Sequence, residues 1–288
     1  MICQYAKATS ALVVVIGLMV TALAGCNQSA AQPENSTAGA QVQSQDKQPS
    51  DDTVAGPGKG MAAIRQAADA GKYLFVFFSK AEDEQTLAMR KVYDKAMEKM
   101  VVRAQAVAVN VTDASEKAIV DKFDLSRAPM PLVLAMAPNG AITGGFPTKF
   151  EEQQLWEAFA SPATEECMKS LQDGKLVFLC VQNEKTKSNE DAMKGVNDFK
   201  ADERFGNSTT VLKLDPTDTK EAKFLADLQV SPKTSEAVTV FLAPPGKPLA
   251  KYEGATNKDS LVDTLVKANT GGCCPGGKCG PGGCGPKQ

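Results

Sequence analysis

One pattern occurs twice along this chain, and this repeat limits the possible fold more than any other feature. The segment ECMKSLQDGKLVFLCVQNE can be laid over AAIRQAADAGKYLFVFFSKA, with Gly174-Lys175 on Gly71-Lys72. TVLKLDPTD then repeats AVAVNVTD, and AVTVFLAPPGKPLAKYEG repeats PLVLAMAPNGAITGGFP. A chain of 288 residues is long enough for two domains. The repeat therefore predicts two tandem domains of one fold, over residues 60–161 and 162–270.

Helical and strand patterns alternate within each repeat. In the first, MAAIRQAADAGK predicts a helix that ends at Gly71, YLFVFF a buried strand, and TLAMRKVYDKAMEKM an amphipathic helix. We expect the apolar face of that helix to include Leu87, Val92, Ala96 and Met100. A strand, a short helix, two strands joined by a PNG turn and a closing helix follow. This order predicts an α/β fold with a mixed sheet flanked by helices, because strands separated by helices pair in parallel and a tight turn makes an antiparallel hairpin.

The order of these elements, with Met-Pro directly before the third strand, resembles the thioredoxin fold. The resemblance implies that Pro131 is a cis proline that faces the corner where the family keeps its redox cysteines. AIRQAADAGKYLFVFF is similar to periplasmic thioredoxin-like domains, in which the strand leads into Trp-Cys-x-x-Cys. Here residues 81–85 take that place, and no cysteine lies between Cys26 and Cys167. The chain therefore resembles tandem thioredoxin-like domains without the CxxC motif.

The degenerate corner of the first repeat consists of Glu82, Asp83, Glu84 and Gln85. Dithiol exchange needs an attacking thiolate, so these side chains predict a corner without redox activity. One interpretation is that the carboxylates begin a helix, where they accept backbone N–H bonds and oppose the positive helix end. The other is that the acidic residues bind a divalent cation or a basic partner.

The second repeat lacks both the Cys-x-x-Cys motif and the proline before the third strand, which are the two marks of the family. Its corner falls at residues 185–188, and Ala237 takes the position of the proline. Cys167 replaces Ile64 on a helix, and Cys180 replaces Phe77 on a strand. A buried, inert thiol is the preferred interpretation for each, because free cysteine packs like a small apolar residue. A disulfide between them is the alternative.

The N-terminal segment has the pattern of a bacterial lipoprotein signal peptide. An apolar run, ALVVVIGLMVTAL, follows Lys7 and ends in LAGC, which resembles the lipobox. The resemblance implies that residues 1–25 are removed and that Cys26 is lipidated, which would anchor the protein to a bacterial membrane, facing the periplasm or the exterior. Asn27 after the cysteine favours the outer membrane by the same resemblance. Residues 26–59 then predict the anchor and a disordered linker, because they are polar and contain no aromatic residue.

The C-terminal segment, residues 271–288, is rich in Cys, Gly and Pro. Its cysteines are Cys273, Cys274, Cys279 and Cys284. Three interpretations stay open: a site for a soft metal ion such as Cu(I) or Zn(II), or for thiol buffering; disulfides within or between chains; and no chemical role.

Composition excludes several classes of function. The chain has no histidine, which removes most hydrolase triads and most mixed zinc sites. Its net charge of -2, without a long basic run, argues against nucleic-acid binding. We expect a membrane-anchored, extracytoplasmic module that binds a protein partner or serves in assembly, with no catalytic residue assigned. The alternative is a thiol-redox or soft-metal protein that uses the C-terminal cysteines.

Overall fold

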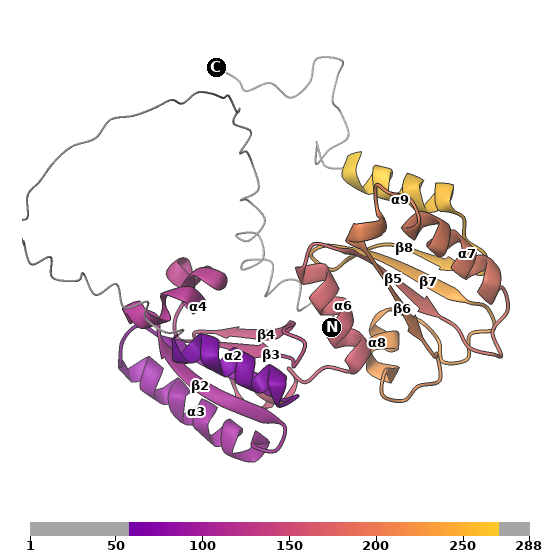
Figure 1. Ribbon diagram of the computed structural model, residues 1–288. Coiled ribbons are helices and arrows are strands. Elements are labelled where there is room, and N and C mark those ends of the chain that lie inside the picture. Colours follow the sequence, from indigo (N-terminus) through magenta and orange to yellow (C-terminus); the bar gives the residue numbers. More distant parts are fainter. Residues whose placement is uncertain (1–57, 271–288) are drawn as a thin grey trace, which may run out of the picture.

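The computed structural model describes residues 58–270, which form two lobes side by side (Figure 1). We call the elements from α2 to α5 unit 1 and the elements from α6 to α9 unit 2. The signal peptide, Cys26, the linker up to residue 57 and the four C-terminal cysteines lie outside the described residues.

Unit 1 contains four strands and their flanking helices. In chain order its elements are α2 (Lys59–Asp69), β1 (Tyr73–Ser79), α3 (Glu84–Met100), β2 (Ala104–Asn110), η1 (Ala114–Glu116), α4 (Lys117–Lys122), η2 (Leu125–Arg127), β3 (Leu132–Met136), β4 (Ile142–Pro147) and α5 (Glu152–Trp156).

Unit 2 repeats this order. Its elements are α6 (Pro162–Gln172), β5 (Leu176–Val181), α7 (Asn189–Lys200), η3 (Gly206–Ser208), β6 (Thr209–Leu214), α8 (Ala222–Asp227), β7 (Val238–Ala243), β8 (Lys247–Glu253) and α9 (Lys258–Thr270).

Each unit is built on one mixed four-stranded sheet. The strand orders are β2-β1-β3-β4 and β6-β5-β7-β8, so the two sheets have the same topology. In both, the first strand pairs in parallel with the second and antiparallel with the third, and the last two strands form an antiparallel hairpin. The predicted fold class, two tandem thioredoxin-like folds with a mixed sheet between helices, is confirmed.

The central strand of unit 1 is buried on both faces, which explains its continuous apolar sequence. Phe75 and Phe77 pack on the α3 side, and Tyr93 of α3 donates a 2.8 Å hydrogen bond to the carbonyl oxygen of Phe75. The expectation that Leu87 lies on the buried face of α3 is wrong, because its side chain is 50% exposed. Thr86 takes the inward position of the first turn, and the next residue is rotated about 100° further around the helix, toward solvent.

The two units meet along α6, which lies between the two sheets (Figure 1). The hydroxyl of Tyr73 donates a 2.5 Å hydrogen bond to Glu165 Oε1 and accepts a 2.9 Å hydrogen bond from the Ala160 N–H. Burial is the main cause that raises the pKa of the Glu165 carboxyl. The guanidinium of Arg103 lies 4.0 Å from the ring centroid of Phe159, in the segment that leads into α6. The Tyr73–Glu165 bond thus holds the first turn of unit 2 against unit 1, and the Ala160 and Phe159 contacts hold the segment before it.

Candidate functional site

The acidic corner of unit 1 begins a helix. Asp83 is the N-cap of α3, and its carboxylate accepts a 2.7 Å hydrogen bond from the backbone N–H of Thr86. This bond is the main cause that lowers the pKa of the Asp83 carboxyl. Glu84 lies in the first turn, where its charge opposes the positive end of the helix. This geometry agrees with the first of the two interpretations of the corner.

The corner is joined to the loop that carries Pro131. The peptide bond between Met130 and Pro131 is cis, at the position that the resemblance gives to a cis proline. Thr148 N–H donates a 2.7 Å hydrogen bond to the carbonyl oxygen of Pro131, and the Thr148 carbonyl accepts a 3.0 Å hydrogen bond from Gln85 Nε2. The corner of unit 1 therefore keeps the arrangement of a helix start facing a proline loop, but it carries no thiol.

Nothing in the described residues supports a cation at this corner. Within residues 58–270, no group of three or more Cys, Asp or Glu side chains is placed to hold a metal ion. Glu82 and Glu84 are exposed, which is the ordinary state of carboxylates at a helix start.

The corner of unit 2 is filled in a different way. Lys187 pairs with Glu236 as an isolated parallel bridge, in which Lys187 N–H donates to Ser235 and Ala237 N–H donates to Lys187, both at 2.9 Å. Ser188 has a left-handed backbone (φ 60°), and its hydroxyl donates to Glu236 Oε2 at 3.0 Å. A backbone bridge thus holds this corner where unit 1 has a cis proline.

A buried threonine, Thr186, holds the loop before α7 together by hydrogen bonds. The Thr186 hydroxyl accepts a 2.9 Å hydrogen bond from Asn183 N–H and lies 2.7 Å from Asn189 Oδ1 and 2.8 Å from the Asn183 carbonyl oxygen. Only 7% of Thr186 is exposed. The network satisfies polar groups inside the loop.

Both cysteines in the described part of the chain are buried and free, so the alternative of a disulfide between them is wrong. Cys167 packs with Val177 and Leu179 on one face of the second sheet, whereas Cys180 packs with Phe178 on the other. The sheet therefore lies between the two sulfur atoms. Burial raises the pKa of each thiol to about 12, as expected for an inert side chain.

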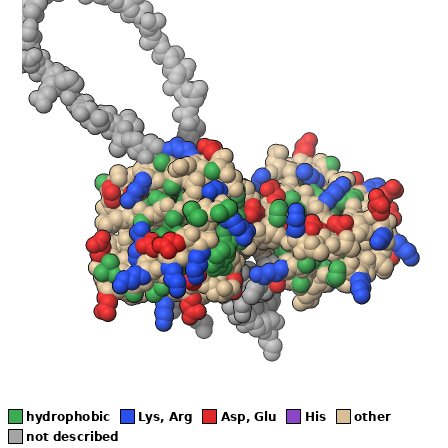
Figure 2. Space-filling view, turned by 90° about the horizontal axis from the view of Figure 1, so that it is seen from below, with side chains coloured by type: hydrophobic (Ala, Val, Ile, Leu, Met, Phe, Trp, Pro, Cys, Tyr) green, Lys and Arg blue, Asp and Glu red, His purple; other side chains and the backbone are tan. Residues whose placement is uncertain are grey.

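Away from the two corners, a cavity of about 760 Å³ lies between the units. Figure 2 shows apolar side chains gathered on the side of unit 1 that faces unit 2. The apolar residues that line the cavity come from both units and include Ile64, Phe123, Met136, Ile142, Phe159, Met168, Leu171, Phe224, Leu242 and Pro245. A mainly apolar cavity at a domain boundary is the usual form of a binding site.

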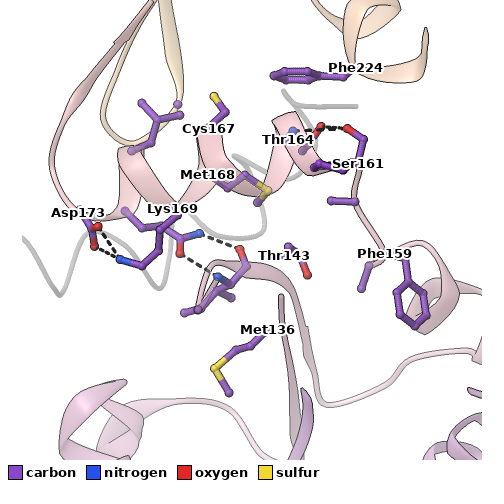
Figure 3. Close-up of a pocket in the computed structure, with 18 of the residues that line it drawn as sticks. Met136, Thr143, Phe159, Ser161, Thr164, Cys167, Met168, Lys169, Asp173 and Phe224 are labelled. Carbon is purple, nitrogen blue, oxygen red and sulfur yellow. Dashed lines mark hydrogen bonds and ion pairs between the residues drawn. The ribbon is translucent and has the colours of Figure 1, made fainter. Parts of the chain in front are cut away.

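Helix α6 forms the wall that both units share (Figure 3). Met168 points from α6 toward the side of unit 1, Lys169 reaches Asp173, and Cys167 points away from Met168, toward the side of Phe224. Met168 packs against the core of unit 1 although it belongs to the first helix of unit 2. It occupies the repeat position of Arg65, which is exposed on α2. The sequence did not lead us to predict this site. Its one signal there is the apolar Met168 at a position where the first repeat has the charged Arg65.

Three lysines at the cavity add positive charge. Lys122 of unit 1 and Lys220 and Lys223 of unit 2 line it with exposed side chains. Within residues 58–270, none of the three forms a salt bridge. Lys169, which also lines the cavity, pairs with Asp173. The carboxylates of Glu157, Asp173 and Asp227 line the same cavity, so its apolar walls carry charges of both signs, with four lysines against three carboxylates.

Comparison with solved structures finds thioredoxins and a disulphide isomerase. Thioredoxin O2 from Arabidopsis thaliana, in the oxidized state, shares 13% identity with this chain, covering 38% of it and 86% of its own chain, with a TM-score of 0.29. The germline-specific thioredoxin Deadhead from Drosophila melanogaster shares 14% identity over 35% of this chain and 90% of its own, with a TM-score of 0.29. A disulphide isomerase from Xylella fastidiosa Temecula1 shares 11% identity over 34% of this chain and 83% of its own, with a TM-score of 0.26. Likenesses of this level carry no argument about activity, and the strand order of both sheets remains the basis of the fold assignment.

A family model for glutamate-cysteine ligase family 2 matches residues 81–175. The matched segment is less than half of the chain, starts after β1 and ends before β5, so it lacks β1 of the first sheet and every strand of the second. It does not place the chain in that family. No curated protein sequence matches the chain.

Among the helices of residues 58–270, none is both long enough and apolar enough to span a membrane.

Proposed function

We propose that this protein is a membrane-anchored, extracytoplasmic thioredoxin-fold protein that binds other polypeptides in the cavity between its two units. The observation that carries the proposal is the cavity itself, an apolar space of about 760 Å³ whose walls come from both sheets and from α6. Burial of apolar surface there supplies the driving force for binding, at about 25 cal/mol per Å² of apolar area removed from water.

The two corners support a role without redox chemistry. Residues 82–85 and 185–188 contain no cysteine, and the described thiols, Cys167 and Cys180, are buried in the core of unit 2. A thiol with a pKa of about 12 is almost entirely protonated at neutral pH and is a poor nucleophile. Neither corner therefore supplies the thiolate that thiol–disulfide exchange requires.

The anchor is proposed from the LAGC sequence that ends the apolar N-terminal run. Cys26→Ser should give a soluble or unprocessed protein, because lipid attachment depends on that thiol. A fully processed Ser variant that still sediments with membranes would refute lipidation at Cys26.

Peptide binding to the mature chain carrying Cys26→Ser tests the main proposal. A fluorescent peptide with six consecutive apolar residues should bind, and Met168→Asp should weaken binding about tenfold by placing a charge on the shared wall. Leu87→Asp is the matched control, because it adds the same charge at an exposed apolar residue beside the corner of unit 1.

Ile64→Asp, on the wall contributed by α2, should weaken binding as Met168→Asp does. Circular dichroism identifies any variant that fails to fold. No binding by the parent chain would refute the proposal, and a loss confined to Leu87→Asp would move the site to the corner.

A second candidate function uses the C-terminal cysteines. Because the thiols described in the fold are buried, Cys273, Cys274, Cys279 and Cys284 are the mature cysteines best suited to metal or redox chemistry, apart from the anchor. We expect the reduced chain to bind about one Cu(I) or Zn(II), more weakly as pH falls, because the ligands must be thiolates. Titration against a chelator, repeated with the four cysteines changed to serine, tests this. Equal metal uptake by both proteins would refute it.

A further inference from the structure

An edge strand borders the cavity, and a side chain covers part of that edge. β4 is the last strand of the first sheet. The amide of Gln172, at the end of α6, donates a 2.7 Å hydrogen bond from Nε2 to the carbonyl oxygen of Ile142 and accepts a 2.8 Å hydrogen bond at Oε1 from the Ile142 N–H. A primary amide that both donates to and accepts from one residue makes the two bonds that a neighbouring strand would make there.

These two hydrogen bonds are open to replacement. Gln172 is exposed, and both bonds lie at the surface. An incoming backbone could offer Ile142 the same donor and acceptor, so the exchange would lose no hydrogen bonds. Uncovered edges attract foreign strands, and proteins commonly protect them with side chains or loops. Gln172 has the geometry of such a protecting group.

The cavity gives a strand at this edge an apolar surface to bury. Ile142 and Thr143 of β4 line the cavity together with Met168 and Leu171 of α6. Side chains of an added strand would alternate between this wall and the opposite side, with a period of two residues. Edge pairing would supply backbone hydrogen bonds and the apolar wall would select the alternate side chains, as in other cases of strand addition.

The charges at the cavity favour one class of peptide. Lys122, Lys220 and Lys223 are exposed and form no salt bridge within residues 58–270. The lysines that line the cavity outnumber its carboxylates, Glu157, Asp173 and Asp227, by one. A segment with acidic residues beside its apolar core would therefore match this surface better than a basic segment would.

We propose that the cavity takes an extended apolar segment of a partner polypeptide, flanked by acidic residues, which pairs with β4 in place of the Gln172 side chain. This inference rests on the proposed function and specifies the class of ligand and its mode of binding. Gln172 protects the edge in the free protein and leaves it when the partner strand arrives.

Two peptides of one sequence test the mode of binding. Both carry six alternating Val and Leu residues between Asp pairs, and the second is N-methylated at alternate amides, which removes the strand-pairing N–H groups and keeps the apolar side chains. The mature chain with Cys26→Ser should bind the first at least about tenfold more tightly, a difference of about 1.4 kcal/mol.

Variants of the protein test the competitor and the charges. Gln172→Ala removes the competing amide and should tighten binding of the unmethylated peptide about threefold, while Gln153→Ala, at an exposed glutamine of α5, should leave the affinity unchanged. Changing the three lysines to glutamate together should reverse the preference for Asp-flanked over Lys-flanked peptides.

The outcomes separate the two levels of the proposal. Equal binding of the methylated and unmethylated peptides, or weaker binding by Gln172→Ala, would overturn strand pairing at β4 and leave apolar binding in the cavity. Failure of both peptides to bind would overturn the proposed function itself. If a fluorescent fatty acid binds and neither peptide does, the ligand is a lipid chain and the inference is wrong.

Discussion

The two strand-to-helix corners occupy equivalent places in the two sheets and are filled differently. In unit 1, Asp83 caps α3 opposite a cis proline loop. In unit 2, Ser188 makes no capping hydrogen bond, and a backbone bridge between Lys187 and Glu236 takes the place of the proline loop. One corner has a capped helix start and a cis proline loop, whereas the other has neither the capping hydrogen bond nor the proline loop.

This difference shows that the fold does not need the corner chemistry in order to form. Both sheets have the same strand order although their corners share no functional residue. The feature that requires both units is the cavity, because its walls come from α2, β3 and β4 on one side and from α6 and α8 on the other. The comparison therefore directs attention from the corners to the space between the units.

Introducing a pair of cysteines at each corner should give the largest difference between the two corners. Asp83 and Thr86 are the N-cap residue and the donor that bonds to it, so a thiolate at residue 83 would accept the same N–H bond and have a lowered pKa. We expect Asp83→Cys with Thr86→Cys to give disulfide reductase turnover in a chain whose four C-terminal cysteines are serines. The same background without the substitutions should show none.

The equivalent pair in unit 2 is Ser188→Cys with Asp191→Cys. We expect turnover at least about tenfold lower, because the left-handed residue 188 faces the Glu236 carboxylate, which disfavours a thiolate by about one pKa unit or more. Reduction of insulin by dithiothreitol-recycled protein measures both. Equal turnover at the two corners would contradict the distinction between them.

Removing one hydroxyl should damage the corner of unit 2. Thr186→Val keeps the shape of the side chain but leaves the Asn183 N–H without its acceptor, so we expect the free energy of unfolding to fall by about 2 kcal/mol. Chemical denaturation followed by circular dichroism measures the change. Thr219→Val, at an exposed threonine, is the control and should change stability by less than about 0.5 kcal/mol. Equal effects would mean that the Thr186 network does not stabilise the corner.

The charge at the corner of unit 1 should have the smallest effect. Asp83→Asn keeps a capping oxygen and removes the charge, so we expect the melting temperature at pH 7 to fall by only about 1 to 2 °C. Because the pKa of Asp83 is lower in the folded protein than its ordinary value of 3.8, the carboxylate stabilises the fold above that value. This contribution is lost as the pH falls through the lowered folded-state pKa.

The difference between Asp83→Asn and the parent should therefore be full at pH 7 and vanish at the lowest pH values. Fluorescence of Trp156, the single tryptophan and a residue of unit 1, follows the melting transition. A difference that persists at low pH would show that the charge is not its cause.

Local patterns in the sequence predicted each fold but not the relation between the two units. The repeat and the apolar runs specify strands such as β1 and β5, because burial of one strand depends on its own residues. The helix-start interpretation of Asp83 followed from its type and position. The prediction that Leu87 is buried was wrong because helical periodicity defines the buried face only to within about one residue. Thr86 is buried in its place.

The cavity could not be predicted because it depends on how α6 sits against the first sheet. That placement is fixed by contacts between residues far apart in the chain, such as Tyr73 with Glu165. The residue types in such a pair do not indicate in the sequence that the two side chains will meet. Met168 did differ in type from its counterpart in the first repeat, the charged Arg65.

Hydrogen exchange of the mature chain, with and without the Asp-flanked apolar peptide, tests the central claim that ligands bind between the units and not at a corner. We expect the peptide to slow amide exchange in residues 142–147 and 167–172, where β4 and α6 line the cavity, and to leave residues 82–87 and 185–190 unchanged. Protection of residues 82–87 together with the Pro131 loop, and none along β4 and α6, would contradict the account, because it would place binding at the corner that has the cis proline loop.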